Sequence, residues 1–213
     1  MYPAPLGGPP NVDPVSFTSV LGVICTVLAF AFVWPQVYRV FRLRSVEGLA
    51  PASSLQAIVG SCLWITYAIH KGNAPLLVSN LAVGIGFSLV AIALIRHRVM
   101  PTWHLLGVIG FFTAYGTIGV LINPAITGWT ATAIGGTSVV PQTIKVLRST
   151  ELVGVSLMMY LMLVLTAIGW GTYSFLIHDV VMAGPNFIVG PCSAIVAAKA
   201  WAARRTPAPA LAR

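Results

Sequence analysis

The sequence contains few charged residues and very few acidic ones. Only 8% of its 213 residues are charged, and only four are Asp or Glu. A soluble domain carries about 25% charged residues, so this composition excludes an ordinary water-soluble fold. Mean hydropathy is +0.90, and 57% of the residues are hydrophobic. The chain is therefore predicted to lie in a membrane.

Ionisable side chains are missing from the middle of the apolar segments. The acids Asp13, Glu47, Glu151 and Asp179 and the four histidines all fall outside these regions. Proton-coupled carriers generally depend on such groups inside the membrane, so obligatory proton coupling is not expected. The three cysteines lie within apolar segments, where we expect packing rather than disulfides or metal binding. No nucleophile, base or metal cluster stands out, so neither an enzyme nor a cofactor is expected.

Seven apolar segments are long enough to cross a bilayer, which takes about 20 helical residues. They are predicted to be helices, because lipid offers no partner for exposed backbone amides. The predicted segments are 15–38, 50–70, 73–95, 102–122, 124–144, 153–177 and 180–200.

Basic residues fall almost entirely on one side of this topology. Eleven of the twelve lie in odd-numbered connections or at the C-terminus, and only Lys71 lies on the other side. Because positive charge marks the cytoplasmic face, the C-terminus is predicted inside and the N-terminus outside, in the plasma membrane. The net charge of +8 then needs no nucleic-acid partner. Residues 1–14 are expected to form a flexible external tail and 204–213 a cytoplasmic tail.

The chain also repeats itself at a spacing of 106 residues. Pro35-Gln36 recurs as Pro141-Gln142, and several further positions recur in the same register, among them Trp64 as Trp170 and Asn80 as Asn186. Because three helices reverse the side of the chain, one linker helix is needed to make the units parallel. The predicted fold is all-α: repeats at 15–98 and 123–203, joined by a linker helix at 101–122, a 3+1+3 arrangement.

These features resemble a known family. A Pro-Gln pair late in the first helix of each three-helix unit, within seven helices, is similar to the SWEET sugar transporters of the PQ-loop (MtN3/saliva) superfamily, whose parallel repeats are an established example. The resemblance covers roughly residues 15–200. It implies facilitative uniport of small neutral sugars by alternating access, with the substrate near the bilayer midplane.

The residues proposed to bind substrate are two Trp–Asn pairs, Trp64 with Asn80 and Trp170 with Asn186. Equal spacing predicts equal membrane depth, so the four side chains are expected to surround one cavity. Indole faces stack on sugar C–H groups, and amides offer donors and acceptors to hydroxyls; in the family, a Trp and an Asn at this spacing line the pocket. The alternatives are Trp in helix packing and Asn as interhelical glue.

One turn before each Trp lie small or hydroxyl-bearing residues. Helical neighbours at i−3 and i−4 share a face, so Ser61 and Thr166 are further candidates for contact with substrate. The alternative is that small residues at these positions allow close helix packing.

Three prolines are candidates for gating. Pro35 and Pro141 are predicted to interrupt their helices, and Pro51 is a third candidate, whose repeat partner is Leu157. In the family, prolines in four helices serve as hinges, so the absence of this fourth proline puts a symmetric four-hinge mechanism in doubt. Static kinks are the alternative.

An outer gate is expected near the end of the second and sixth helices. Tyr67 and Tyr173 follow each Trp by one turn and are expected to close the external mouth. Lys71 and Asp179 are expected to pair as a latch, which resembles the family's outer gate. If so, Asp179→Asn shifts the protein toward an outward-open state. Two solvated loop charges are the alternative.

Two other functions fit parts of the pattern. A PQ-loop amino-acid exporter fits the Ser45–Leu49 stretch, but the predicted cavity offers no charge to a charged substrate. A seven-helix receptor is the other alternative, although a rhodopsin needs a lysine in the middle of its seventh helix, and here only Lys199 lies in it, at the cytoplasmic end. The expected partners are a mono- or disaccharide and the lipid bilayer, and homo-oligomers are compatible with the sequence.

Overall fold

The structure is a computed structural model that describes residues 16–46, 49–149 and 156–205, and within these ranges all regular elements are helices. The predicted tail 1–14 and residues 206–213 of the C-terminal tail lie outside the described residues. Six described helical spans are long and apolar enough to cross a membrane. The all-α prediction is confirmed.

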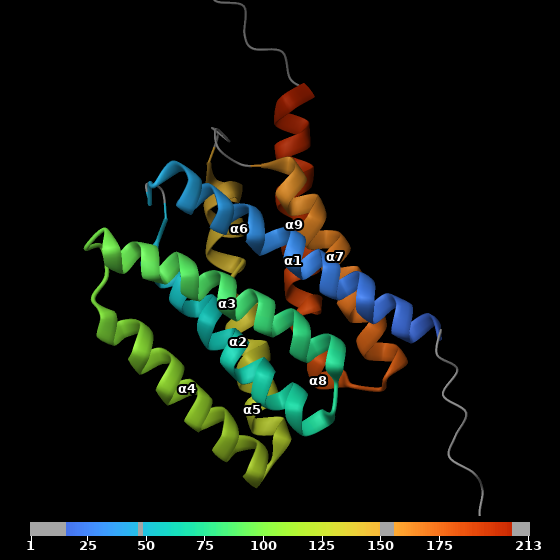
Figure 1. The fold of residues 1–213 in the computed structure, drawn as a ribbon. Helices are drawn as coiled ribbons and strands as arrows, with labels where there is room; N and C mark the ends of the chain where they lie inside the picture. Colours follow the sequence, from blue (N-terminus) through green and yellow to red (C-terminus); the bar gives the residue numbers. More distant parts are fainter. Residues whose placement is uncertain (1–15, 47–48, 150–155, 206–213) are drawn as a thin grey trace, which may run out of the picture.

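The helices follow the predicted segments closely, with two of the segments divided (Figure 1). Their bounds are α1 Phe17–Leu43, α2 Pro51–Lys71, α3 Ala74–Arg96, α4 Thr102–Ile122, α5 Pro124–Thr137, α6 Val140–Arg148, α7 Leu157–Leu176, α8 Val180–Ala183 and α9 Asn186–Arg205.

The helix starts are set by local capping. Ser16 accepts a hydrogen bond from the amide of Ser19, and Ser156 accepts one from the amide of Met159. Asn73 caps α3 and Asp179 caps α8 in the same way, through the amides of Leu76 and Met182 respectively. Such caps satisfy backbone donors that a helix leaves free at its first turn. Asn73 and Asp179 stand 106 positions apart, so the repeat extends to its caps.

The two repeats have the same internal arrangement. In the first, α3 lies between α1 and α2; in the second, α9 lies between α7 and the α5–α6 pair. The two groups meet where α1 packs on α7 and α2 packs on α5, while α4 covers α2 and α5. This is the predicted 3+1+3 fold of parallel repeats.

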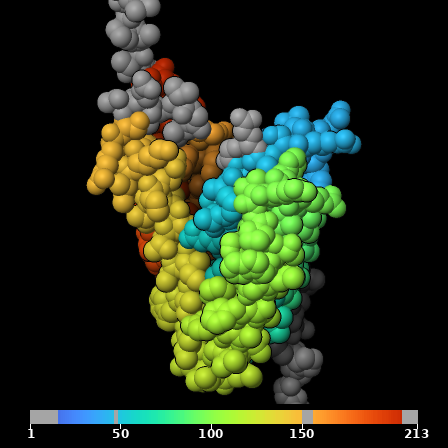
Figure 2. All heavy atoms as spheres, turned by 90° about the vertical axis from the view of Figure 1, so that its left-hand side faces the viewer, coloured from blue at the N-terminus to red at the C-terminus, as the bar shows by residue number. Residues whose placement is uncertain are grey.

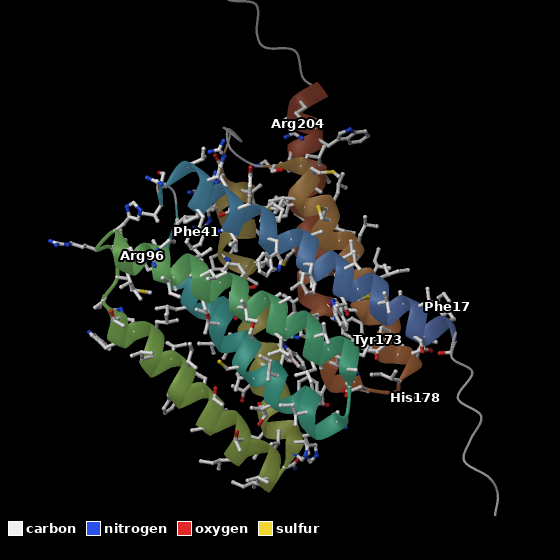
Figure 3. The ribbon with its side chains drawn as sticks, in the orientation of Figure 1. Phe17, Phe41, Arg96, Tyr173, His178 and Arg204 are labelled. Atoms are coloured by element: carbon white, nitrogen blue, oxygen red, sulfur yellow. The ribbon has the colours of Figure 1, made fainter. Side chains whose placement is uncertain are left out.

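The two ends of the bundle differ in charge. Arg96 and Arg204 lie toward one end, which we call the basic end, whereas Phe17 and His178 lie toward the other (Figure 3). We call this second end the hairpin end, because it carries the tight α2–α3 and α7–α8 connections.

The fifth predicted span is broken rather than continuous. Segment 124–144 is predicted as one membrane span that Pro141 interrupts, and in the structure α5 ends at Thr137 and α6 begins at Val140. Pro141 lacks an amide hydrogen, and glycine is a weak helix former, so the Gly135-Gly136 pair before it adds to the weakness. The Ser138 hydroxyl also hydrogen-bonds the carbonyl of Gly135 at 2.6 Å. This local competition with the backbone favours a break.

The other two prolines behave differently from the prediction. Helix α1 runs through Pro35 without interruption, because the remaining backbone bonds of a 27-residue helix carry it past one missing donor. Pro51 is the first residue of α2, where an amide hydrogen would have no helical partner anyway. Neither interrupts its helix, and their roles in gating stay predictions. The sequence reading missed Pro191, which lies inside α9.

Close helix contact at Gly86 gives a prediction for stability. A Cβ at Gly86 of α3 would meet the side chain of Val33 of α1, whereas a Cβ at Gly110 of α4 would meet nothing within 4 Å. We expect Gly86→Ala to lower the free energy of unfolding by about 1–3 kcal/mol. Gly110→Ala, the matched control, should leave it unchanged or raise it by up to about 1 kcal/mol. Thermal unfolding in detergent measures both, and equal midpoints would contradict the α1–α3 contact.

Candidate functional site

A cavity of about 270 Å³ lies between the two repeats. Its walls come from α1, α2 and α3 on one side and from α7, α8 and α9 on the other. Four of the residues predicted from sequence line it together: Trp64, Asn80, Trp170 and Asn186. Because two residues come from each repeat, the cavity inherits the approximate twofold relation of the repeats.

Each Trp ring is held by the Tyr one turn later. The rings of Trp64 and Tyr67 meet edge to face at 5.6 Å and 86°, and those of Trp170 and Tyr173 do so at 5.7 Å and 89°. Edge-to-face aromatic pairs contribute about 0.5–1.5 kcal/mol beyond their buried area. The two tyrosines are 1% and 5% exposed, so each forms a fixed support for the indole beside it.

The two Asn side chains also have matching environments. Asn80 donates an Nδ2 hydrogen bond to the carbonyl of Leu76 at 2.9 Å, and Asn186 donates one to the carbonyl of Met182 at 3.3 Å. An amide has a second N–H and a carbonyl oxygen still available. Each Asn can therefore offer a substrate one donor and one acceptor from a side chain whose orientation is already fixed.

The cavity carries no charged side chain among its described lining residues. Besides the four residues above, its polar groups are the hydroxyls of Thr166 and Ser79, and the rest of the wall is apolar. An uncharged wall of this kind matches a neutral, hydroxylated ligand better than an ionic one, because a buried charge needs a partner.

Of the two hydroxyl residues predicted beside the Trp pair, the structure brings only Thr166 to the cavity. Ser61 instead lines a separate cavity between α2, α3 and α4. Its side chain lies against Gly84, and the repeat-related Ala167 lies against Gly190. Position i−3 from each Trp thus serves helix packing, while at position i−4 of the second repeat Thr166 lines the cavity. The repeat partner of Thr166 is Gly60. A Cβ atom added to Gly60 would have no neighbouring atom within 4 Å.

The hairpin end of the cavity is closed by two hydrogen bonds between the repeats. The hydroxyl of Tyr67 donates to the carboxylate of Asp179, at 2.9 Å and 3.0 Å from its two oxygens. The hydroxyl of Tyr173 donates to Oδ1 of Asn73 at 3.2 Å. The second bond is the repeat-related copy of the first, since Asn73 stands where Asp179 stands in the other half. We call these four residues the tyrosine gate.

Lys71 does not form the predicted latch with Asp179. Its ammonium lies over the ring of Tyr67, 5.6 Å from the ring centre, and no ion pair joins it to Asp179 in the described part of the chain. The carboxylate is only 9% exposed, and it is satisfied by the Tyr67 hydroxyl and the amide of Met182. A flexible lysine at the exposed end of α2 is less able to enter this site than a tyrosine one turn earlier.

The basic end has a different shape. Figure 2 shows a hollow there between α6 and α2, while α5 and α4 lie against each other toward the opposite end. Pro141 and Gln142 lie in the first turn of α6 and are exposed. The bundle is thus closed at the hairpin end and parted at the basic end.

Sequence reasoning missed three polar residues that the structure brings into use. Asn73 is one, although the 106-residue register pairs it with Asp179 and could have revealed it. Gln56 donates to the carbonyl of Ile134 across the repeat interface at 3.1 Å. Lys199 donates three hydrogen bonds to the end of α6. For Gln56 and Lys199, the sequence feature that could have revealed them is a polar residue within an apolar span.

Comparison with known proteins gives related results by sequence and by fold. The PQ loop repeat family matches residues 17–77. The bidirectional sugar transporter SWEET15 of Oryza sativa is 29% identical over 187 residues, which cover 79% of this chain and 58% of the rice protein. The sugar transporter SemiSWEET of Bradyrhizobium diazoefficiens is 36% identical over 56 residues, covering 26% of this chain and 62% of that protein.

Among solved structures, the 3.7 Å structure of a eukaryotic SWEET transporter superposes with a TM-score of 0.75 at 13% identity. The match covers 90% of this chain and all of that one. At this identity the match establishes the shared fold. The chain spans less than two thirds of the length of the rice relative.

Proposed function

We propose that this chain is a SWEET-type member of the PQ-loop proteins, to which it is similar in sequence and fold, and that it carries small neutral sugars across a membrane by facilitated diffusion. The observation that supports this most directly is the single cavity that holds both Trp–Asn pairs. Apolar indole faces suit the C–H face of a sugar ring, and the two amides suit its hydroxyls. The protein is integral to the membrane.

Alternating access provides the transport mechanism. The basic end is assigned to the cytoplasm, because basic residues concentrate on the cytoplasmic side of membrane proteins. The tyrosine gate then closes the external mouth, while the hollow between α6 and α2 faces inward (Figure 2). We accordingly assign this conformation to the inward-facing state of the proposed cycle. In the outward-facing state the gate bonds break and the basic end closes over the substrate.

The cavity wall also bears on which sugar is carried. Thr166 supplies a hydroxyl from the second repeat, and its repeat partner Gly60 has no side chain to supply one from the first. Substrate is therefore held asymmetrically, with an additional hydroxyl contact on the second repeat. The plasma membrane is the proposed location.

Counterflow in proteoliposomes tests this function. Vesicles loaded with unlabelled glucose or sucrose should accumulate the labelled sugar transiently without any imposed proton gradient, and a protonophore should not reduce the exchange. The physical reason is that no carboxylate or histidine lines the cavity to take up a proton. Protein-free vesicles are the control. Uptake that requires a proton gradient would contradict uniport, and failure to exchange any neutral sugar would contradict sugar transport itself.

A further inference from the structure

Lys199, the first charged residue along α9, makes an unusual set of contacts. Lys199 of α9 is half-buried, and its ammonium donates to the carbonyls of Val146, Leu147 and Ser149 at 2.8, 2.9 and 2.9 Å. These carbonyls lie at the C-terminal end of α6, where a helix leaves its last acceptors without intrahelical donors. A lysine there satisfies them and also interacts favourably with the negative end of the helix dipole.

This contact has no counterpart in the first repeat. The residue 106 positions before Lys199 is Ala93, a buried residue of α3. The corresponding end of α1 is instead closed by Arg44, which adopts a left-handed conformation with φ of 50°. The lysine is therefore a feature of the second repeat alone, and the general architecture of two similar halves does not account for it.

Packing joins α6 to the same neighbour. Val139 and Val146 share a buried cluster with Tyr160 of α7 and with Val196 and Ala197 of α9. On the other side of the break, α5 packs mainly on α2 and α4 and also contacts α8 and α9, and Gln56 of α2 donates a hydrogen bond to the carbonyl of Ile134. The main partners of the two pieces thus differ, α9 for α6 and α2 for α5, and residues 138–139 lie between the pieces.

We propose that Lys199 fixes α6 to α9, so that the two move as one unit about the break at Ser138–Val139 when the basic end opens and closes. Lys199 is a positioning residue: it lies outside the sugar cavity and acts through α6. The proposal rests on the proposed alternating access, but the coupling of α6 to α9 is measurable without any transported sugar.

Distance measurements between spin labels test this coupling in the intact protein. Cys25, Cys62 and Cys192 are first replaced. One label pair, on the exposed residues Ile144 and Ile195, reports the distance between α6 and α9. A second pair, on Ile144 and the exposed Ser53, reports the distance between α6 and α2. We expect the α6–α2 distribution to contain two populations and the α6–α9 distribution to stay single and narrow. If the α6–α9 distance varies as widely as the α6–α2 distance, the proposal is wrong.

Variants of Lys199 provide the second arm. Lys199→Met should broaden the α6–α9 distribution and lower the maximal exchange rate about tenfold, since losing hydrogen bonds from a charged donor costs roughly 1.5–3 kcal/mol. The sugar concentration at half-maximal rate should change less than about twofold, because the cavity is untouched. Lys199→Arg should restore the narrow distribution.

The matched control is Lys145→Met, which removes an exposed lysine from α6 itself and should leave both quantities at wild-type values. An unchanged α6–α9 distribution in folded Lys199→Met protein would overturn the proposal. Absence of sugar exchange in the wild type would instead contradict the proposed function, whatever the label distances show.

Discussion

Replacing Trp170 by alanine is expected to lower sugar exchange at subsaturating concentration by about a hundredfold. The substitution removes one of the two indole faces of the cavity and also the partner of the Tyr173 ring. Truncation of an aromatic anchor at a binding surface costs about 2–4 kcal/mol, and 1.4 kcal/mol corresponds to tenfold. Trp64→Ala should have a similar effect, because the repeat gives it the same position and the same tyrosine support.

Asn186→Ala is expected to raise the half-saturating sugar concentration about tenfold. It removes one donor and one acceptor that the cavity offers, and a lost hydrogen bond that leaves its partner unsatisfied costs roughly 1–3 kcal/mol. Counterflow of labelled glucose and sucrose measures both variants. Trp103→Ala is the matched control, because Trp103 is 68% exposed on α4 and lies away from the cavity. Full transport by both Trp170→Ala and Asn186→Ala would remove the proposed site.

The cavity residues were predictable from sequence because two constraints acted together. A spacing of 106 residues relates the halves, and a constant interval of sixteen residues relates each Trp to its Asn. The two repeats are related by an approximate twofold axis. If a pair of residues in one repeat faces this axis, the matching pair in the other repeat faces it too, and the four residues surround one site. The structure places all four in one cavity, as this reasoning expected.

Ser61 shows where the same reasoning loses precision. Successive helical residues differ by about 100° in direction, so Ser61 and Gly60 point to different neighbours although both lie one turn before Trp64. Only the packing of α3 decides which of them faces the cavity, and Gly84 provides a site into which Ser61 fits closely. Gly60 and Gly84 are both visible in the sequence. The direction from which α3 packs on α2 cannot be read from it.

The outer gate shows a second limit, which concerns electrostatics. Opposite charges at Lys71 and Asp179 suggested an ion pair, because charge is easy to see in a sequence with so little of it. Burial changes the preference: a carboxylate that is 9% exposed needs well-placed donors more than a distant cation. The Tyr67 hydroxyl and the Met182 amide are such donors, and neither carries a charge that draws attention in the sequence.

Asp179→Ala is expected to shift the protein strongly toward the outward-open state. In the closed gate, Tyr67 is 1% exposed and its hydroxyl has the Asp179 carboxylate as its partner. Removing the carboxylate leaves a buried hydroxyl unsatisfied, which costs roughly 1–3 kcal/mol. The closed population should therefore fall about tenfold to a hundredfold relative to the open one. Label pairs on the exposed residues Ile69 and Phe175, at the hairpin ends of α2 and α7, report this distance.

Two substitutions at the same gate separate a tyrosine gate from an ion-pair latch. Asp179→Asn keeps an acceptor for Tyr67, and the other half already uses this arrangement, because Asn73 accepts from Tyr173. It should therefore stay close to wild type, unlike the strong shift that a Lys71–Asp179 latch predicts. Lys71→Met removes only the contact with the Tyr67 ring, worth about 0.5–1 kcal/mol at an exposed site, and should cause a small shift. If Lys71→Met opened the mouth as far as Asp179→Ala, closure would depend on the ammonium charge, and the repeat-related hydrogen bonds would be secondary to it.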